Sequence, residues 1–343
     1  MIDIKLLEQL CLCNGISGDE GNVRNLIINE IKDCADDIKT DNLGNLIVFK
    51  KGKKSAKSKL MVSAHMDEVG LMVTDITSDG YLKFDEVGGI DRRVLPGKRV
   101  CVGRNGFNGV IGVKPIHLTN GDEKTAVPKM SDMYIDIGAE SREDALKYVN
   151  YGDGINFEGD FKINGKTVVT KALDDRFGCY VLINLIKSEP EYDMYFTFVV
   201  QEEVGLRGAR PAAFTVNPDF ALVIESTTAA DVAEVDASHQ VCNLSKGATV
   251  TVMDRATVYD KEMISAAFEL AEKNNIAVQY KRAVAGGNDS GAIHQSRGGV
   301  RTLAVSLPSR YIHAPSTAAN LDDCESVLKL AKVLSDYIAG GNL

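Results

Sequence analysis

Three apolar segments of this chain each end at a histidine or an acidic residue, and this pattern constrains the fold more than any other feature. Residues 195–201 carry no charge and are mostly aromatic or β-branched, which is typical of a strand buried on both faces of an α/β sheet. The segments and the residues that follow them are 59–64 before His65, 195–201 before Glu202 and Glu203, and 220–224 before Glu225. Because functional groups gather outside the carboxyl ends of strands in open α/β sheets, the sequence predicts one shared site.

The acids at these strand ends require a cationic partner, since a buried carboxylate is costly to keep ionised on its own. Residues 171–176, at the start of a predicted helix, and 310–315, in a predicted loop, add further candidates. The candidate metal ligands are His65, Asp174, Glu203, Glu225 and His313, with Glu202 left over. Two imidazoles and three carboxylates suit a pair of divalent ions. Asp174 is the favoured bridge, because two cations about 3.5–4 Å apart need a shared anion between them.

Residues next to the candidate ligands have predicted roles of their own. Asp67 lies two residues after His65 and so shares its face of the strand. We expect the Asp67 carboxylate to accept the second imidazole N–H and thereby to fix the orientation of the ring. Asp175 is expected to cap the helix that it opens. Glu202 and Glu203 are adjacent in an extended segment, so their side chains point in opposite directions and cannot share one role.

The distribution of turns divides the chain into two parts. Residues 69–165 consist of short strands separated by Gly and Asp turns, which predicts a small all-β barrel or sandwich. Helical and strand patterns alternate on either side of this stretch. The fold class is therefore predicted as α/β, a mixed sheet flanked by helices, with a catalytic domain of residues 1–68 and 166–343 and an inserted β domain of residues 69–165.

Local patterns also predict individual helices. The predicted helices are 4–13, 21–34, 174–187, 261–274 and 322–339. Ser17 is expected to cap the second of these and to form a capping box with Glu20, three residues later.

Composition excludes several classes of protein. The net charge of −9 over 343 residues argues against nucleic acid or an anionic membrane as the main partner. The N-terminal residues do not match a signal peptide, and no apolar run approaches the length of a membrane span. The seven cysteines are scattered, so we expect reduced thiols in a cytoplasmic protein.

Four segments, in order along the chain, resemble the TET family of dinuclear metallo-aminopeptidases, which includes glutamyl and deblocking aminopeptidases and some members labelled cellulase M. The matching segments are 63–70, 171–176, 201–209 and 311–313, with softer matches at 94–97, 134–138 and 288–292. The resemblance implies two Zn or Co ions per chain, a cis peptide bond between Asp174 and Asp175, Glu203 as a ligand and Glu202 as the proton carrier. Glu225 departs from the family, which often has Asp at that position.

The resemblance also implies partners and a substrate. It implies that the inserted domain builds a homo-oligomer, a dodecamer assembled from dimers, and that loop 116–129, which contains His117, lies at a subunit contact. It implies peptide substrates with a free N-terminus, and it places residues 286–290 near the specificity pocket. Lys281 and Arg282 precede that loop, and a basic group there favours an acidic or neutral P1 residue, as in glutamyl- or aspartyl-preferring members.

Two other functions are compatible with parts of the sequence. A glycoside hydrolase, as the cellulase M label suggests, needs two carboxylates across the scissile bond, but this chain has no Trp to stack on sugars and its acids occur together with histidines. A non-catalytic metal-binding homologue is expected to have lost the base or a ligand, whereas Glu202 and every ligand type are present. Both alternatives are therefore disfavoured.

Overall fold

A mixed sheet of eleven strands forms the larger part of the molecule in this computed structural model, which describes residues 2–343. Met1, the first residue of the predicted catalytic segments, lies outside the described residues. In order of pairing, the strands are β1 (Asp37–Thr40), β2 (Leu46–Lys50), β12 (Met194–Val199), β3 (Leu60–His65), β13 (Phe220–Thr228), β16 (Arg301–Arg310), β17 (Thr317–Asn320), β11 (Thr167–Thr170) and β10 (Lys162–Asn164), with β14 (Ala248–Val250) beside β16 and β15 (Val278–Tyr280) beside β14. The four central strands β12, β3, β13 and β16 run parallel, so their carboxyl ends lie at the same edge.

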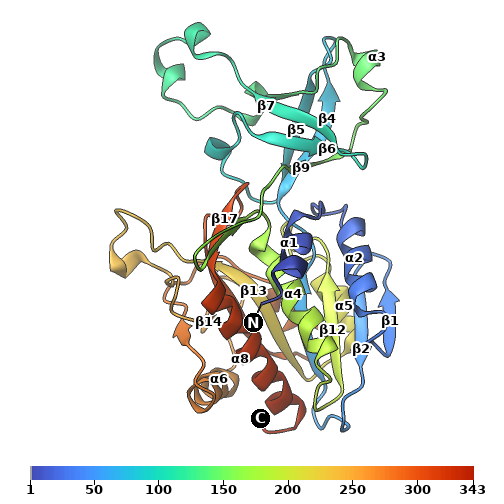
Figure 1. Cartoon of the computed structure of the whole chain (residues 1–343), viewed down its shortest axis with the longest axis vertical. Helices are drawn as coiled ribbons and strands as arrows, with labels where there is room; N and C mark the ends of the chain where they lie inside the picture. Colours follow the sequence, from blue (N-terminus) through green and yellow to red (C-terminus); the bar gives the residue numbers. More distant parts are fainter. Residues whose placement is uncertain (1) are drawn as a thin grey trace.

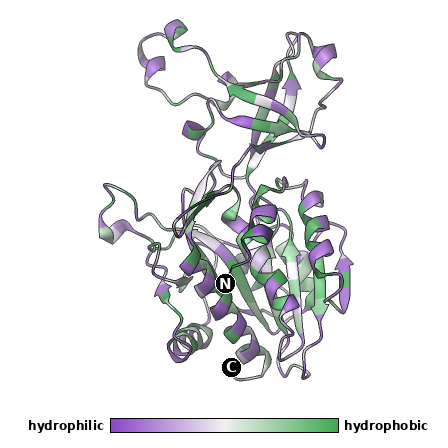
Figure 2. Cartoon of the chain, viewed as in Figure 1, coloured by the Kyte–Doolittle hydropathy of each residue, from purple (hydrophilic) through white to green (hydrophobic). Residues whose placement is uncertain are grey.

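Helices cover the sheet and bury its apolar strands (Figure 1). They are α1 (Ile4–Leu12), α2 (Gly21–Ile31), α4 (Leu173–Lys187), α5 (Ala209–Val216), α6 (Lys261–Lys273), α7 (Ser290–Ile293) and α8 (Leu321–Ala339). α4 packs on β3 and β13 and also against α1, α2 and α8. Because it is enclosed on nearly every side, most of its residues are buried, as expected for a helix that is apolar all round. Figure 2 shows the corresponding concentration of hydrophobic residues in the central strands.

A separate closed β-barrel stands at one end of the molecule, above the sheet in Figure 1. Around the barrel, its strands are β4 (Gly70–Ile76), β5 (Leu82–Val87), β8 (Tyr134–Asp136), β7 (Phe107–Gly112), β6 (Arg99–Val102) and β9 (Gly154–Phe157). The barrel has its own hydrophobic core, which includes Leu71, Val100, Ile135 and Ile155. This core does not depend on the large sheet for its apolar contacts.

Short helices lie in the connections. They are α3 (Arg142–Ala145) and the 3₁₀ helices η1 (Arg92–Val94), η2 (Ile116–Leu118), η3 (Gly121–Lys124), η4 (Met130–Asp132) and η5 (Ala237–His239). Within residues 2–343, no helix combines the length and hydropathy that crossing a bilayer requires. All seven cysteines are free.

The predicted fold class is confirmed, whereas one local prediction is wrong. Ser17 and Glu20 do not form a capping box, and α2 begins with no side-chain cap. The Ser17 hydroxyl instead donates to the Asp67 carboxylate at 2.6 Å, and Glu20 accepts from the Gln201 amide at 3.2 Å. Glu20 also accepts the Gly18 N–H at 2.6 Å, so Ser17 bonds to a distant residue and Glu20 to both a near and a distant one.

Strand pairing shows which strands belong to the barrel and which to the large sheet. The barrel strands lie between Gly70 and Phe157, whereas β10, which falls inside the predicted insert, pairs with β11 in the large sheet. The division of the chain at residues 69 and 165 stays a prediction.

Candidate metal centre

Parallel pairing brings the candidate residues to one edge of the sheet. β12 lies beside β3 with Val199 level with His65, so Glu202 and Glu203 emerge next to the end of β3. Glu225 lies on β13, the other parallel neighbour of β3. His313 follows β16, and Asp174 lies at the start of α4, which packs on β3 and β13.

The candidate ligands form two groups that share one carboxylate. In the first group, His65 Nε2 lies 3.4 Å from Asp174 Oδ1 and 3.6 Å from Glu225 Oε2. In the second, His313 Nε2 lies 3.4 Å from Asp174 Oδ2 and 3.3 Å from Glu203 Oε2. Each oxygen of Asp174 therefore faces a different group.

These distances fit a metal ion in each group. Ligands about 2.0–2.1 Å from a tetrahedral zinc ion lie about 3.3–3.4 Å from one another. Three of the four distances match this spacing, and the contact to Glu225 is slightly longer. The other Glu225 oxygen, Oε1, is buried without a hydrogen-bond partner among the described residues, so it is free to accept a cation.

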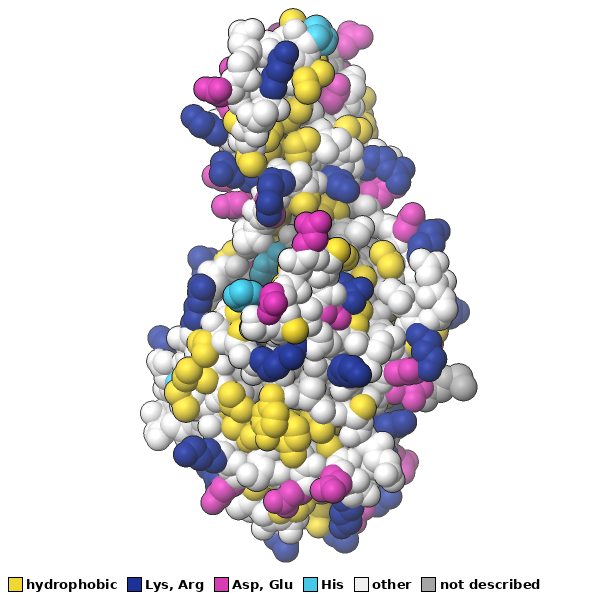
Figure 3. Space-filling model, turned by 90° about the vertical axis from the view of Figure 1, so that its left-hand side faces the viewer, with side chains coloured by type: hydrophobic (Ala, Val, Ile, Leu, Met, Phe, Trp, Pro, Cys, Tyr) yellow, Lys and Arg dark blue, Asp and Glu magenta, His cyan; other side chains and the backbone are white. Residues whose placement is uncertain are grey.

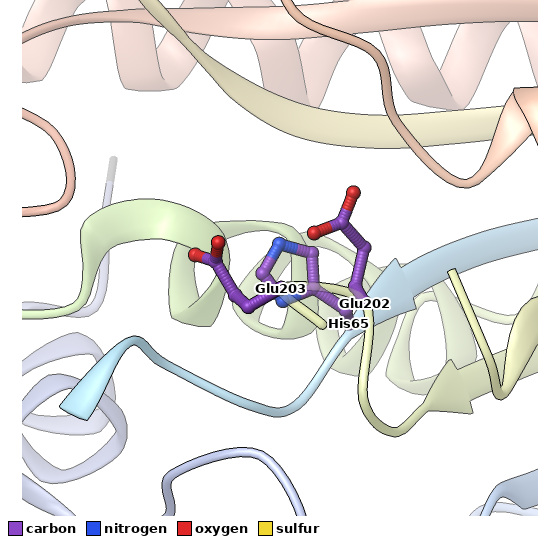
Figure 4. Close-up of side chains that lie close together, drawn as sticks. All are labelled: His65, Glu202 and Glu203. Atoms are coloured by element: carbon purple, nitrogen blue, oxygen red, sulfur yellow. The ribbon is translucent and has the colours of Figure 1, made fainter. Parts of the chain in front are cut away.

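Glu202 and Glu203 lie in a turn after β12 and not in the extended segment that the sequence predicted. Figure 4 shows their carboxylates on either side of the His65 imidazole. Glu202 forms a third candidate group with His65 and Glu203, whose ligand atoms lie within 4.8 Å of one another, but it belongs to neither of the groups that share Asp174.

The Asp67 carboxylate orients the acidic loop rather than the His65 ring, which corrects the predicted contact. His65 Nδ1 lies 3.0 Å from the Asp67 backbone oxygen but 3.6 Å from its carboxylate. The two carboxylate oxygens instead accept the backbone N–H groups of Glu202 at 3.0 Å and Glu203 at 3.1 Å. The Asp67 backbone carbonyl can reach the His65 ring because β3 ends at His65 and the chain turns after it.

Asp175 caps α4, as expected. Its carboxylate accepts the Gly178 N–H at 2.9 Å and the His65 N–H at 3.2 Å. A Cβ atom at Gly178 would lie 2.2 Å from the Asp175 carboxylate, so only glycine fits there. The peptide bond between Asp174 and Asp175 is cis.

The electrostatics of the site favour cations. Burial raises the pKa of Glu202 and of Glu225 well above the usual range, and neighbouring acids add to the effect against the opposing charge of His65. Burial likewise raises the pKa of Glu203 to about 7, with a further contribution from Asp174. Although burial disfavours the charged imidazole, Asp174 and Glu203 raise the pKa of His313 to about 9. These shifts reflect an excess of buried negative charge, which cations bound at the site would offset.

Asp289 is an additional buried acid that was not predicted as a site residue. It is fully buried, and neither of its carboxylate oxygens has a hydrogen-bond partner within residues 2–343. Burial raises its pKa to about 7, and its charge contributes to the raised pKa of Glu202. The only signal in the sequence was its place in the soft match at 288–292.

A cavity of about 140 Å³ opens beside the first group of ligands. His65, Glu202 and Glu225 line one part of it, and Lys281, Gly286 and Asn288 line another. Lys281 is only 9% exposed, and its ammonium group donates to the Ala285 carbonyl at 2.9 Å. No ion-pair partner of Lys281 exists among the described residues.

Comparison with known proteins places the chain in a family. Residues 44–330 match the family model described as M42 glutamyl aminopeptidase. A relative from Acetivibrio thermocellus that is assigned as an aminopeptidase is 44% identical, over 95% of this chain and 96% of its own length. The lysyl aminopeptidase of Pyrococcus furiosus is 34% identical, over 98% of both chains.

A solved structure agrees with these matches. The TET1 peptidase of Pyrococcus horikoshii, which can assemble into a tetrahedron or a large octahedral shell, is 39% identical, with a TM-score of 0.85 over 96% of this chain and 98% of the other. The resemblance stated from the sequence is therefore confirmed, and the glycoside hydrolase and non-catalytic alternatives give way to a peptidase. The chain belongs to the M42 glutamyl aminopeptidase family and is a metal-dependent peptide hydrolase.

Proposed function

We propose that this protein is a dinuclear aminopeptidase that removes N-terminal residues from peptides, using two divalent ions, Zn²⁺ or Co²⁺. The observation that carries the proposal is the sharing of Asp174 between the two ligand groups. His65, Asp174 and Glu225 would hold one ion, and Asp174, Glu203 and His313 the other. Ions bound there supply Lewis acidity, which polarises a peptide carbonyl and lowers the pKa of water.

Glu202 is the proposed proton carrier. Its carboxylate lies outside the two groups that share Asp174, and Asp67 holds its backbone N–H. Burial raises its pKa, so its carboxylate binds a proton more readily than an exposed glutamate does. Glu202 takes a proton from the attacking water and then donates it to the leaving amine.

The cavity supports a preference for an acidic N-terminal residue. Lys281 is a nearly buried cation without an ion-pair partner among the described residues, and it lines the cavity next to His65 and Glu225. A buried charge is costly unless it is paired. A P1 carboxylate from glutamate or aspartate supplies the missing partner.

We expect peptides with a free N-terminal glutamate to be the best substrates in a four-peptide panel of Glu-first and Ala-first sequences, each free and N-acetylated. Acetylation delocalises the amine lone pair, so it should reduce kcat/KM roughly ten- to hundredfold or more, as expected for one lost charge-assisted contact. Replacing the N-terminal Glu by Ala should lower kcat/KM roughly tenfold, because the contact between the P1 carboxylate and Lys281 is lost. The measurement is kcat/KM for each peptide, with products identified by mass spectrometry. Equal cleavage of free and acetylated peptides at an internal bond would show an endopeptidase instead.

We also propose that the chain assembles into a homo-oligomer, a dodecamer built from dimers. Loop 116–129 of the barrel exposes Ile116, Leu118 and Val127, and further hydrophobic side chains gather on one face of the large domain (Figure 3). Exposed apolar patches of this kind mark interaction surfaces. Light scattering should give a mass near twelve chains; a mass of one chain at micromolar concentration rules the assembly out.

A further inference from the structure

One wall of the cavity is the loop that carries Lys281, Gly286 and Gly287. Lys281 joins the sheet through its backbone N–H, which donates to the Val250 carbonyl at 2.9 Å. Gly286 and Gly287 then form the cavity wall and carry no side chains that could anchor it. The position of the Lys281 ammonium depends on this wall, because the ammonium donates to the Ala285 carbonyl, next to Gly286.

A buried polar network holds the far end of this loop. The Tyr259 hydroxyl donates to Asp254 Oδ2 at 2.6 Å and accepts from Asn288 Nδ2 at 2.9 Å. The exposed fractions of Tyr259, Asp254 and Asn288 are 3%, 4% and 7%. Asn288 Oδ1 accepts the Ser290 N–H at 2.9 Å, so both the nitrogen and the oxygen of its side-chain amide form hydrogen bonds. Satisfied buried networks of this kind fix one conformation.

Asp254 connects this network to the glycine wall. Its second oxygen, Oδ1, accepts the N–H groups of Ala256 and Thr257, both at 2.8 Å, and so closes a tight turn. Within that turn, the Arg255 N–H donates to the Gly286 carbonyl at 3.0 Å. Contacts therefore run without a break from the Tyr259 hydroxyl through Asp254 and Gly286 to the carbonyl that receives Lys281.

Close packing leaves these two loops little freedom. A Cβ atom at Gly291 would lie 2.7 Å from the Ala256 Cβ, and one at Gly287 would lie 3.6 Å from it. The turn at residues 254–257 and the loop at 285–291 are therefore in direct contact.

We propose that Tyr259 is a positioning residue for substrate selection, whose hydroxyl holds the cavity wall so that Lys281 meets an acidic P1 side chain. The inference rests on the proposed acidic preference and adds the residue that enforces it. Tyr259 contacts neither ligand group in the site, so its effect reaches the substrate only through the wall.

The test compares Tyr259→Phe with the matched change Tyr280→Phe in the metal-loaded, assembled enzyme. Tyr280 lies on the neighbouring strand β15, is half exposed and stacks on Phe268, outside the network. We expect Tyr259→Phe to reduce the ratio of kcat/KM for Glu-first over Ala-first peptides about three- to tenfold. The change should come mainly from KM, because the contact with the P1 side chain is made in both the ground state and the transition state. Tyr280→Phe should leave the ratio unchanged, and both variants should keep the wild-type metal content.

Lys281→Met separates the two proposals. In one outcome, Lys281→Met abolishes the acidic preference while Tyr259→Phe leaves the ratio at the wild-type value. That result supports Lys281 as the partner of the P1 carboxylate and overturns the positioning role of Tyr259. An equal loss on both peptides in Tyr259→Phe also overturns it, because that result indicates a general structural role. A wild-type enzyme without acidic preference overturns both proposals.

Discussion

Replacing Glu202 with Gln lowers kcat by at least about a hundredfold while both metal ions stay bound. Acid–base catalysis by a positioned side chain contributes about 10²–10⁴ in rate, and the amide cannot accept the proton from water. Gln keeps the size of Glu, and the contact that positions residue 202 involves its backbone N–H and the Asp67 carboxylate. The geometry of the loop should therefore survive the substitution.

Glu203→Gln is the matched control, since it changes the adjacent residue in the same way. Glu203 lies 3.3 Å from His313 Nε2 in a group that includes Asp174. This variant should lose the ion of that group as well as activity. Loss of metal in Glu202→Gln with retention in Glu203→Gln would mean that the two roles are exchanged. Metal content per chain and kcat, measured on the same preparations, decide the question.

Replacing Asp174 with Asn removes both ions and, with them, nearly all activity. One oxygen of Asp174 faces His65 and the other faces His313, so a single substitution weakens both groups. Mutation of a residue that only hydrogen-bonds to a metal ligand typically lowers metal affinity about 10–100-fold. Mutation of a ligand shared by two ions should lower metal affinity further. The variant should therefore contain far less than one ion per chain after dialysis against metal-free buffer.

His313→Ala supplies the comparison for Asp174→Asn. His313 belongs to the second group alone, so this variant should keep about one ion, held by His65, Asp174 and Glu225. If Asp174→Asn also keeps one ion, the carboxylate does not bridge the two groups. Circular dichroism of each variant shows whether the fold has been kept.

The strands and the ligand candidates could be predicted because each depends on residues close together in the sequence. Apolar segments predict β3, β12 and β13, and parallel pairing brings His65, Glu203 and Glu225 to one edge. The segments at 171–176 and 311–313 predict Asp174 and His313 as ligands. Asp175 has its expected capping role in the first turn of α4.

Contacts between distant segments could not be predicted in the same way. Ser17 was expected to cap α2, but it bonds to Asp67, fifty residues away. Asp67 was expected to hold the His65 ring, but its carboxylate holds the amides of Glu202 and Glu203, more than a hundred residues on. In both cases a local pattern offered one good partner, and the tertiary fold offered another. Asp289 was missed because nothing in its own neighbourhood reveals that it is buried among the site acids.

Titration of metal-stripped wild-type enzyme with Zn²⁺ or Co²⁺ tests the central claim most directly, with bound ions and aminopeptidase activity followed together. Sharing of Asp174 predicts binding of two ions per chain, absence of activity without metal, and full recovery only as the second equivalent binds. Full activity in the stripped enzyme, or saturation of both binding and activity at one ion per chain, would contradict the two-ion site.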